Sequence, residues 1–195
     1  MKKRFISICL LLFFSLPVLF YSIPVQASGG SIFLAGNYVG QDKTNWCWAA
    51  CSENLIRWEG NPYLNQWNAV YYIFGQHESD PYPDKTASIA ATADAAGYIS
   101  NFQHSYVGVN SPMSDSFLYW QLCCSHPVVC SGGLYVSGKR KNGHQVLVCG
   151  WYDGSYQSTL TYFDSALQQY RTCSYSEFCN GSFNGRIYDR TCYHL

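Results

Sequence analysis

The sequence predicts an α+β domain in which helices come first and antiparallel strands second. Segments with helix-forming residues and glycine or proline boundaries recur between residues 46 and 124. After Pro127, short β-branched runs separated by turn residues take over, a pattern typical of strands and hairpins. We find no internal repeat and no linker, so the two kinds of element are expected to form one layered domain rather than alternating βαβ units.

The first 27 residues, MKKRFISICLLLFFSLPVLFYSIPVQA, have the pattern of a cleavable export signal. Three basic residues precede a mostly apolar run from Phe5 to Phe20, and Val25-Gln26-Ala27 offers small residues to a signal peptidase. A membrane anchor is the alternative, but Pro17 interrupts the run. We therefore expect a signal peptide at 1–27, a secreted protein, and one domain at 28–195.

The charge of the expected mature chain limits its partners. Residues 28–195 carry nine Lys and Arg against twelve Asp and Glu, a net charge of −3. The basic run Lys139-Arg140-Lys141 is interpreted as a loop tip, and this balance disfavours nucleic acid. No phosphate-binding glycine loop is present. We expect a monomer with no cofactor, and no membrane association once the signal is removed.

Helices are expected throughout the first part of the domain, after an extended segment at 28–41. Asn45 is the expected N-cap of a helix at about 46–59, with Gly60 as its stop. Three further helices are expected: from Asn61-Pro62 to Gly75, at 86–96 with Gly97 as the stop, and at 114–124.

Strands are expected in the second part, where apolar runs are short and bounded by turn residues. The segment STLTYFDS and the following QQYRTCS are expected to form a hairpin. A short irregular or helical piece, SYSEFCNG, follows it. The expected strands lie at 126–136, 143–152, 158–165, 168–174 and 185–194.

Nine cysteines remain after the signal is removed, and two of them lie in the first helix. An exported protein meets an oxidising environment, so disulfides are expected, but an odd number leaves at least one thiol unpaired. Cys47, in the first helical turn, lies where the helix dipole favours a thiolate, the nucleophilic form. Cys51 is expected to be a structural cysteine bonded elsewhere, and a structural disulfide is the alternative for Cys47.

A thiolate nucleophile needs a base, and His144 is the best candidate among five histidines. It follows Asn142-Gly143 and opens the apolar run HQVLVCGW, which is typical of an interior strand. A structural histidine is the alternative. The other four lie in less suggestive surroundings: His77 in a proline-rich loop, His104 alone, His126 before a proline and His194 beside the C-terminus.

Two more residues complete the candidate site. Asp164 lies near the end of the next strand, 20 residues after His144, where a carboxylate could orient the imidazole and stabilise its charged form. Asp153 is the competing orienter, although Asp-Gly favours a tight turn. Gln41, six residues before Cys47, could donate its side-chain amide to an oxyanion together with the Cys47 backbone N–H.

These motifs resemble the papain-like cysteine peptidase superfamily. The residues that carry the resemblance are Gln-x5-Cys-Trp at a helix start in QDKTNWCWAA, Gly-His on a strand in NGHQVLVCGW, and an Asp at the end of the following strand. NWCWAA, NGHQVLVCGW and YFDS with the later SYSEF are more similar to compact secreted bacterial members, such as a plant-pathogen effector protease, and HPVVCSGG is similar to the double-glycine peptidases that process bacteriocins.

The resemblance spans about residues 41–178 and implies a papain-like fold, with the nucleophile helix packed on a C-terminal antiparallel sheet. By position it implies Cys47 as nucleophile, His144 as base, Asp164 as orienter and Gln41 as oxyanion donor, in an enzyme that hydrolyses proteins or peptides. The chain departs from the pattern in having Asn45-Trp46 before the Cys-Trp pair, Ser165 after the Asp, and many cysteines.

Three other interpretations stay open from the sequence. A Cys–His amidohydrolase or acyltransferase acting on cell walls would use the same machinery on another bond. A non-catalytic, disulfide-bonded binding or toxin-like module would keep only the fold. Cysteine zinc ligands are disfavoured, because Cys47-x3-Cys51 and Cys173-x5-Cys179 lack the usual spacing, and no metal is expected.

Overall fold

The computed structural model describes residues 30–195, apart from 62–63, 76–78, 155–156 and 182–184. The predicted signal peptide lies outside the described residues. Within these residues, we find no helix with the length and apolar character needed to span a bilayer.

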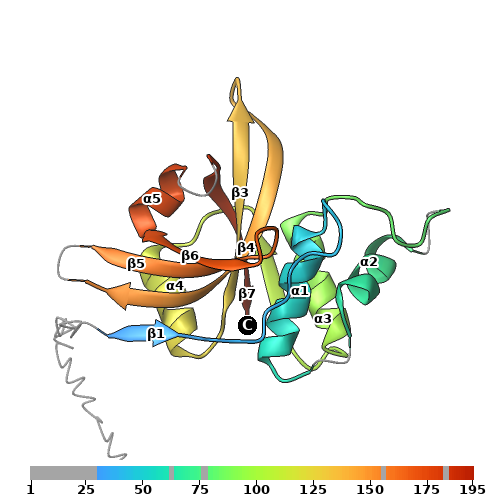
Figure 1. The fold of residues 1–195 in the computed structure, drawn as a ribbon, viewed down its shortest axis with the longest axis horizontal. Coiled ribbons are helices and arrows are strands. Elements are labelled where there is room, and N and C mark those ends of the chain that lie inside the picture. The colour runs from blue at the N-terminus through green and yellow to red at the C-terminus, as the bar shows by residue number, and fades with distance from the viewer. Residues whose placement is uncertain (1–29, 62–63, 76–78, 155–156, 182–184) are drawn as a thin grey trace, which may run out of the picture.

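The domain has a helical part and a sheet part that lie side by side (Figure 1). The helical part precedes most of the sheet in the chain, as predicted, and packs against the sheet through α1 and α3. It consists of α1 (Cys47–Trp58), α2 (Gln66–Phe74) and α3 (Ile89–Ile99). The sheet part also carries α4 (Asp115–Cys123) and α5 (Tyr175–Asn180). The predicted α+β class is confirmed.

The sheet is antiparallel at every described pairing, in the order β2-β7-β3-β4-β5-β6, and β1 pairs with β4. Its strands are β1 (Ser31–Phe33), β2 (Tyr106–Val109), β3 (Val128–Val136), β4 (Lys139–Asp153), β5 (Ser158–Asp164), β6 (Gln169–Ser174) and β7 (Ile187–His194). The strands predicted after Pro127 are all present. The four-residue strand β2 was not predicted, because a single short run inside the helical part gives little period-2 signal.

A tight turn joins the two longest strands, β3 and β4. Ser137 and Gly138 both have positive φ, 51° and 73°, as a two-residue hairpin turn of matching twist requires. The basic run that follows therefore belongs to β4, which begins at Lys139. The prediction that this run forms a loop tip is wrong, because the turn needs only the two residues before it.

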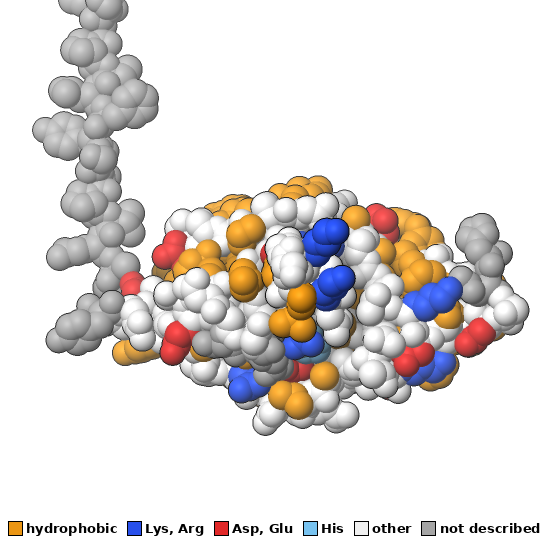
Figure 2. All heavy atoms as spheres, turned by 90° about the horizontal axis from the view of Figure 1, so that it is seen from above, with side chains coloured by type: hydrophobic (Ala, Val, Ile, Leu, Met, Phe, Trp, Pro, Cys, Tyr) orange, Lys and Arg blue, Asp and Glu red, His pale blue; other side chains and the backbone are white. Residues whose placement is uncertain are grey.

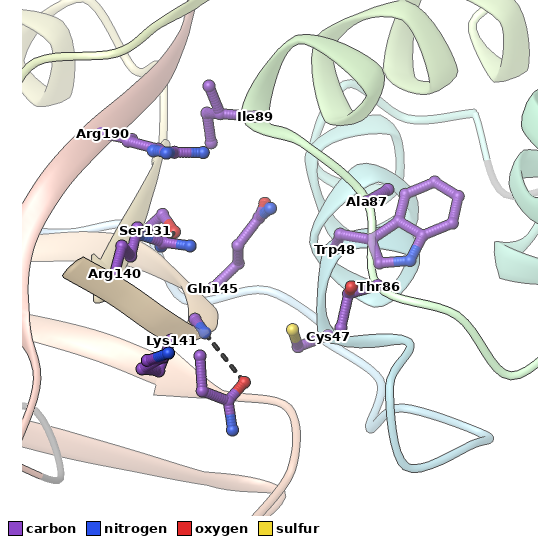
Figure 3. A pocket seen from close by; sticks show the side chains of 12 residues that line it. Cys47, Trp48, Thr86, Ala87, Ile89, Ser131, Arg140, Lys141, Gln145 and Arg190 are labelled. Carbon is purple, nitrogen blue, oxygen red and sulfur yellow. Dashed lines mark hydrogen bonds between the residues drawn. The ribbon is translucent and has the colours of Figure 1, made fainter. Parts of the chain in front are cut away.

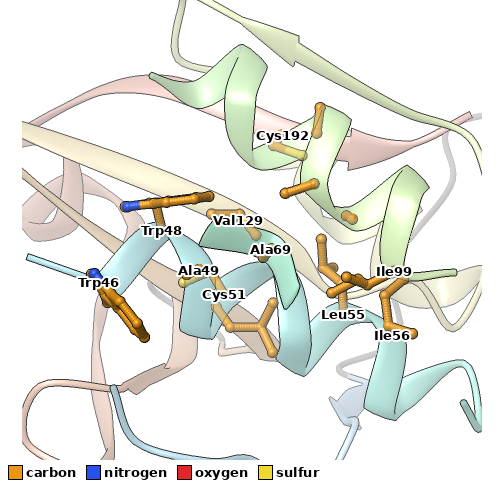
Figure 4. Packing of buried hydrophobic residues seen from close by; sticks show 14 of the residues in the cluster. Trp46, Trp48, Ala49, Cys51, Leu55, Ile56, Ala69, Ile99, Val129 and Cys192 are labelled. Carbon is orange, nitrogen blue, oxygen red and sulfur yellow. The ribbon is translucent and has the colours of Figure 1, made fainter. Parts of the chain in front are cut away.

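Both faces of the sheet are covered, and alternate residues on β3 and β4 point to different cores. Val129 and Leu147 pack with α1, α2 and α3 in one cluster. Val128 and Val146 pack with α4 and α5 in a second cluster. Successive side chains on a strand point to opposite faces, so a strand buried on both sides needs a continuous apolar run, as VLVCGW provides. Figure 4 shows the first cluster, centred on α1.

Three helices begin later than predicted. Trp46 occupies the N-cap of α1 and makes no side-chain cap hydrogen bond, because an indole offers no acceptor oxygen. Asn45, the predicted N-cap, lies one residue earlier, and its side chain donates to the Asp84 carbonyl at 3.1 Å. Asn65 caps α2, accepting hydrogen bonds from two backbone N–H groups, so this helix does not open at Asn61-Pro62. Ser88 caps α3, which continues through Gly97 to Ile99.

Candidate active site

Cys47 is the first residue of α1, and two buried indoles fix the chain on either side of it. Trp46 donates its ring N–H to the Pro83 carbonyl at 2.9 Å, and Trp48 donates to the Lys85 carbonyl at 3.0 Å. Both rings are almost completely buried. The loop at 83–85 is thereby bound across the start of the helix, and the position of Cys47 is set from both neighbours.

The sheet brings His144 and Asp164 together. His144 lies on β4, and Asp164 ends β5, the neighbouring strand, in a register that places Leu147 opposite Phe163. The His144 Nε2 and Asp164 Oδ1 atoms are 2.8 Å apart. Asp164 is fully buried, and its Oδ1 also accepts from the Ala166 backbone N–H at 3.0 Å. The competing orienter, Asp153, lies at the far end of β4.

The electrostatics of the pair favour its charged form. Burial alone lowers the pKa of His144. The hydrogen bonds and charge interactions of the ring with Asp164 and Cys47 outweigh the effect of burial and raise this pKa to about 9. Burial raises the pKa of Asp164, but its bond and charge interaction with His144 and two backbone N–H groups lower it overall. Since Nε2 contacts Asp164, the ring nitrogen that remains for Cys47 is Nδ1.

Gln41 lies beside the nucleophile but its amide group is already engaged. Its Nε2 donates to the carbonyls of Lys43 at 2.9 Å and Thr44 at 2.7 Å. Its Oε1 is buried and has no hydrogen-bond partner among the described residues. The Gln41 backbone N–H donates to the Ser165 carbonyl at 3.0 Å. This bond ties the segment before α1 to the residue after Asp164.

Two cavities meet at Cys47 and share Thr86, Asn142 and Gly143 in their walls. One, of about 300 Å³, also contains Gln41 and His144. The other, of about 260 Å³, extends between α1 and the sheet. Figure 3 shows the Cys47 sulfur facing this second cavity, opposite Gln145 and Lys141. Together they form a groove, which we call the Cys47 cleft.

The basic residues of the cleft were not predicted as site residues. The second cavity is lined in part by Arg140, Lys141 and Arg190, and Lys and Arg side chains gather near the middle of this face (Figure 2). Arg140 is paired with Asp189, with 2.6 Å between Nε and Oδ2. The basic run at 139–141 was visible in the sequence. Its place on the same strand as His144 became clear only once the turn was located at Ser137-Gly138.

The cysteines differ from the expectation of disulfides. All nine in the described residues are free thiols, and no pair lies at bonding distance. Cys51, predicted to be bonded elsewhere, is instead buried in the first core cluster. Cys130 and Cys149 are likewise buried, in the second cluster. A buried cysteine behaves as a small apolar side chain, which explains why these positions need no bond.

The fold is similar to those of known peptidases. A structure from a study of the mite allergens Blo t 1 and Der p 1 matches with a TM-score of 0.56 and 12% identity, covering 88% of this chain and 74% of that one. Digestive procathepsin L 3 of Tenebrio molitor larval midgut gives 0.56 and 12%, covering 85% and 69%. No protein-family model and no curated protein matches the sequence. Both structures are papain-like cysteine peptidases, and the chain has the papain-like fold.

Proposed function

We propose that the protein is a secreted cysteine peptidase that hydrolyses peptide bonds in proteins or peptides, with Cys47, His144 and Asp164 as its triad. The observation that carries the proposal is the 2.8 Å contact between His144 and Asp164. Cys47 interacts with the same imidazole and lies where the two cavities meet. A thiol, an imidazole and an orienting carboxylate are the components of covalent acyl transfer.

In the first half of the reaction, Cys47 gives its proton to His144, its sulfur attacks the carbonyl carbon of the scissile bond as a thiolate, and a C–S bond forms. The carbonyl oxygen becomes an oxyanion, which the Cys47 backbone N–H stabilises at the start of the helix. The Gln41 amide joins this hole if one of its two N–H groups leaves its carbonyl partner for the stronger charged acceptor. The imidazolium of His144 then protonates the leaving amine, and the C–N bond breaks.

In the second half, water replaces the amine. His144, now neutral, accepts a proton from the water as it attacks the thioester carbonyl. The C–S bond breaks, the acid product leaves, and the proton on His144 restores the imidazolium. Asp164 keeps the ring oriented throughout and stabilises its positive charge.

The test is cleavage of casein by the protein purified without residues 1–27. Cys47→Ala should abolish cleavage, whereas Cys123→Ser, which changes an exposed thiol on α4, should leave it unchanged. Peptidoglycan is the second substrate in the same assay. Cleavage of peptidoglycan alone would replace the peptidase by a cell-wall amidohydrolase, and full activity of Cys47→Ala would contradict both.

A further inference from the structure

A second group of chemically reactive side chains lies outside the Cys47 cleft. Glu59, His104 and His194 each offer one ligand atom, and these three atoms all lie within 4.8 Å of one another. In the sequence, these residues are separated by 45 and 90 positions. Sequence spacing therefore gives no indication of the group, and neither His104 nor His194 was predicted to be the base for Cys47.

The fold brings the three side chains together from three different elements. Glu59 is the C-cap of α1, and His104 lies in the loop before β2. His194 is the last residue of β7 and pairs with Tyr106 of β2. The Leu195 backbone N–H donates to the Ser105 carbonyl at 3.0 Å, which holds the loop against the end of the chain. The group therefore joins the helical part to the edge of the sheet.

The hydrogen bonding of this group is incomplete. The Nδ1 atom of His194 is buried and has no partner among the described residues, and neither has the hydroxyl of Tyr106, whose ring is 5.4 Å from that of His194. The His104 Nδ1 and Glu59 Oε2 atoms are 3.9 Å apart, too far for a hydrogen bond. A buried nitrogen without a partner costs free energy, and an ion that accepted its lone pair would remove that cost.

We propose that Glu59, His104 and His194 bind a zinc ion. Two imidazoles and one carboxylate are a donor set that Zn²⁺ takes in proteins, with a fourth position left for water. Ligand atoms around tetrahedral zinc are about 3.3 Å apart, so the side chains must move closer, by about 0.6 Å for the 3.9 Å separation between His104 Nδ1 and Glu59 Oε2. Glu59 and His104 can do so, because their side chains are 19% and 27% exposed.

The neighbours of the site are consistent with this assignment. A cavity of about 330 Å³, lined by His104, Tyr106 and Leu195 among others, opens beside it and provides a route for a hydrated ion. The ring of His126 packs against that of His194, with 4.1 Å between centroids. We assign His126 to positioning this ring rather than to binding the metal.

The zinc site is independent of the proposed peptidase chemistry. Glu59 follows the last residue of α1 and Cys47 is the first, so the two sites are about 18 Å apart along the helix axis. Binding would connect the end of α1 to β7, and an ion that binds only the folded state stabilises it. We therefore expect zinc to raise the melting temperature whether or not the protein cleaves peptides.

The experiment is calorimetric titration of ZnCl₂ into the reduced, metal-free protein carrying Cys47→Ala, together with its melting temperature with and without zinc. The Cys47→Ala background removes one thiol ligand, and CaCl₂ serves as the control ion that prefers oxygen donors. Glu59→Gln and His104→Ala should each weaken binding of one zinc equivalent by more than about tenfold and abolish the rise in melting temperature. His126→Phe, which keeps the ring contact, should retain both.

Each outcome decides the proposal. Equal zinc stoichiometry and equal stabilisation in the parent, Glu59→Gln and His104→Ala would overturn it and assign any bound zinc to the remaining thiols. Loss of binding in His126→Phe as complete as in His104→Ala would overturn the three-residue assignment. Circular dichroism of each metal-free variant establishes that it is folded before zinc is added.

Discussion

His144 is held between a carboxylate and a thiol, and this position sets the pH range of the proposed reaction. The pKa of His144 is raised to about 9, so the imidazolium that donates to the leaving group persists through neutral pH. It is lost as the pH rises through that value. We therefore expect kcat/KM to fall on the alkaline side near pH 9, as the free enzyme loses this proton.

Asp164→Asn tests the origin of this raised pKa. The amide keeps a hydrogen bond but removes the negative charge that favours the imidazolium, while burial continues to lower the pKa of His144. The alkaline limb should move to lower pH, and kcat/KM at pH 7 should fall by more than about tenfold. An alkaline limb that stays where it is would show that Asp164 does not act on His144. The pH profile of cleavage of a fluorogenic peptide measures both.

Gln41 tests the second half of the proposed oxyanion hole. Gln41→Ala should lower kcat by as much as about 10²–10³-fold with little change in KM, if its amide contacts the oxyanion only in the transition state. The alternative is that Gln41 only supports the loop, through the carbonyls of Lys43 and Thr44. In that case both parameters and the melting temperature would change, with no selective loss of kcat. Steady-state kinetics beside a thermal melt separate the two.

At the scale of elements, the sequence predicts the strands better than the helix starts. A strand such as β4 shows itself in a continuous apolar run, because both of its faces are buried. A helix start depends on which side chain is available to cap it. Asn45 would be a good cap by type, but its side chain binds the Asp84 carbonyl, a contact 39 residues away that no local pattern reveals.

The start of α1 depends on the loop that its two indoles bind. Trp46→Phe keeps most of the buried ring but removes the N–H that pairs with the Pro83 carbonyl. A buried carbonyl left without its donor should cost about 1–3 kcal/mol of unfolding free energy. Trp120→Phe, at a position 56% exposed, is the matched control and should change stability by less than about 0.5 kcal/mol. Urea denaturation followed by circular dichroism measures both, and equal effects would contradict this account of the loop.

At the scale of the whole molecule, the papain-like fold and three of the candidate residues follow from the sequence because they are carried by separate, recognisable motifs. A Cys-Trp pair lies at a helix start, a Gly-His precedes the buried apolar run of β4, and an Asp ends the next strand. The basic wall of the cleft and the group at Glu59, His104 and His194 could not be predicted, since each joins residues far apart in the sequence that only the tertiary fold brings together.

The cysteines provide a further prediction at this scale. Alkylation of the unfolded protein without reductant should modify nine thiols in residues 28–195, because no described pair lies at bonding distance. Alkylation of the native protein should reach the exposed Cys123 and Cys124 before the buried Cys130, Cys149 and Cys192. Intact-mass measurement counts the thiols, and fewer than nine in the unfolded protein would demonstrate disulfides that this structure does not contain.

The most direct test of the central claim is where a limiting amount of a peptidyl epoxide reacts at pH 7. Peptide mapping by mass spectrometry should place the adduct on Cys47, although Cys47 is only 7% exposed and Cys123 and Cys124 are open to solvent. The adduct should disappear in His144→Ala. Reaction first at Cys123 or Cys124, unchanged by His144→Ala, would contradict the claim that His144 activates Cys47.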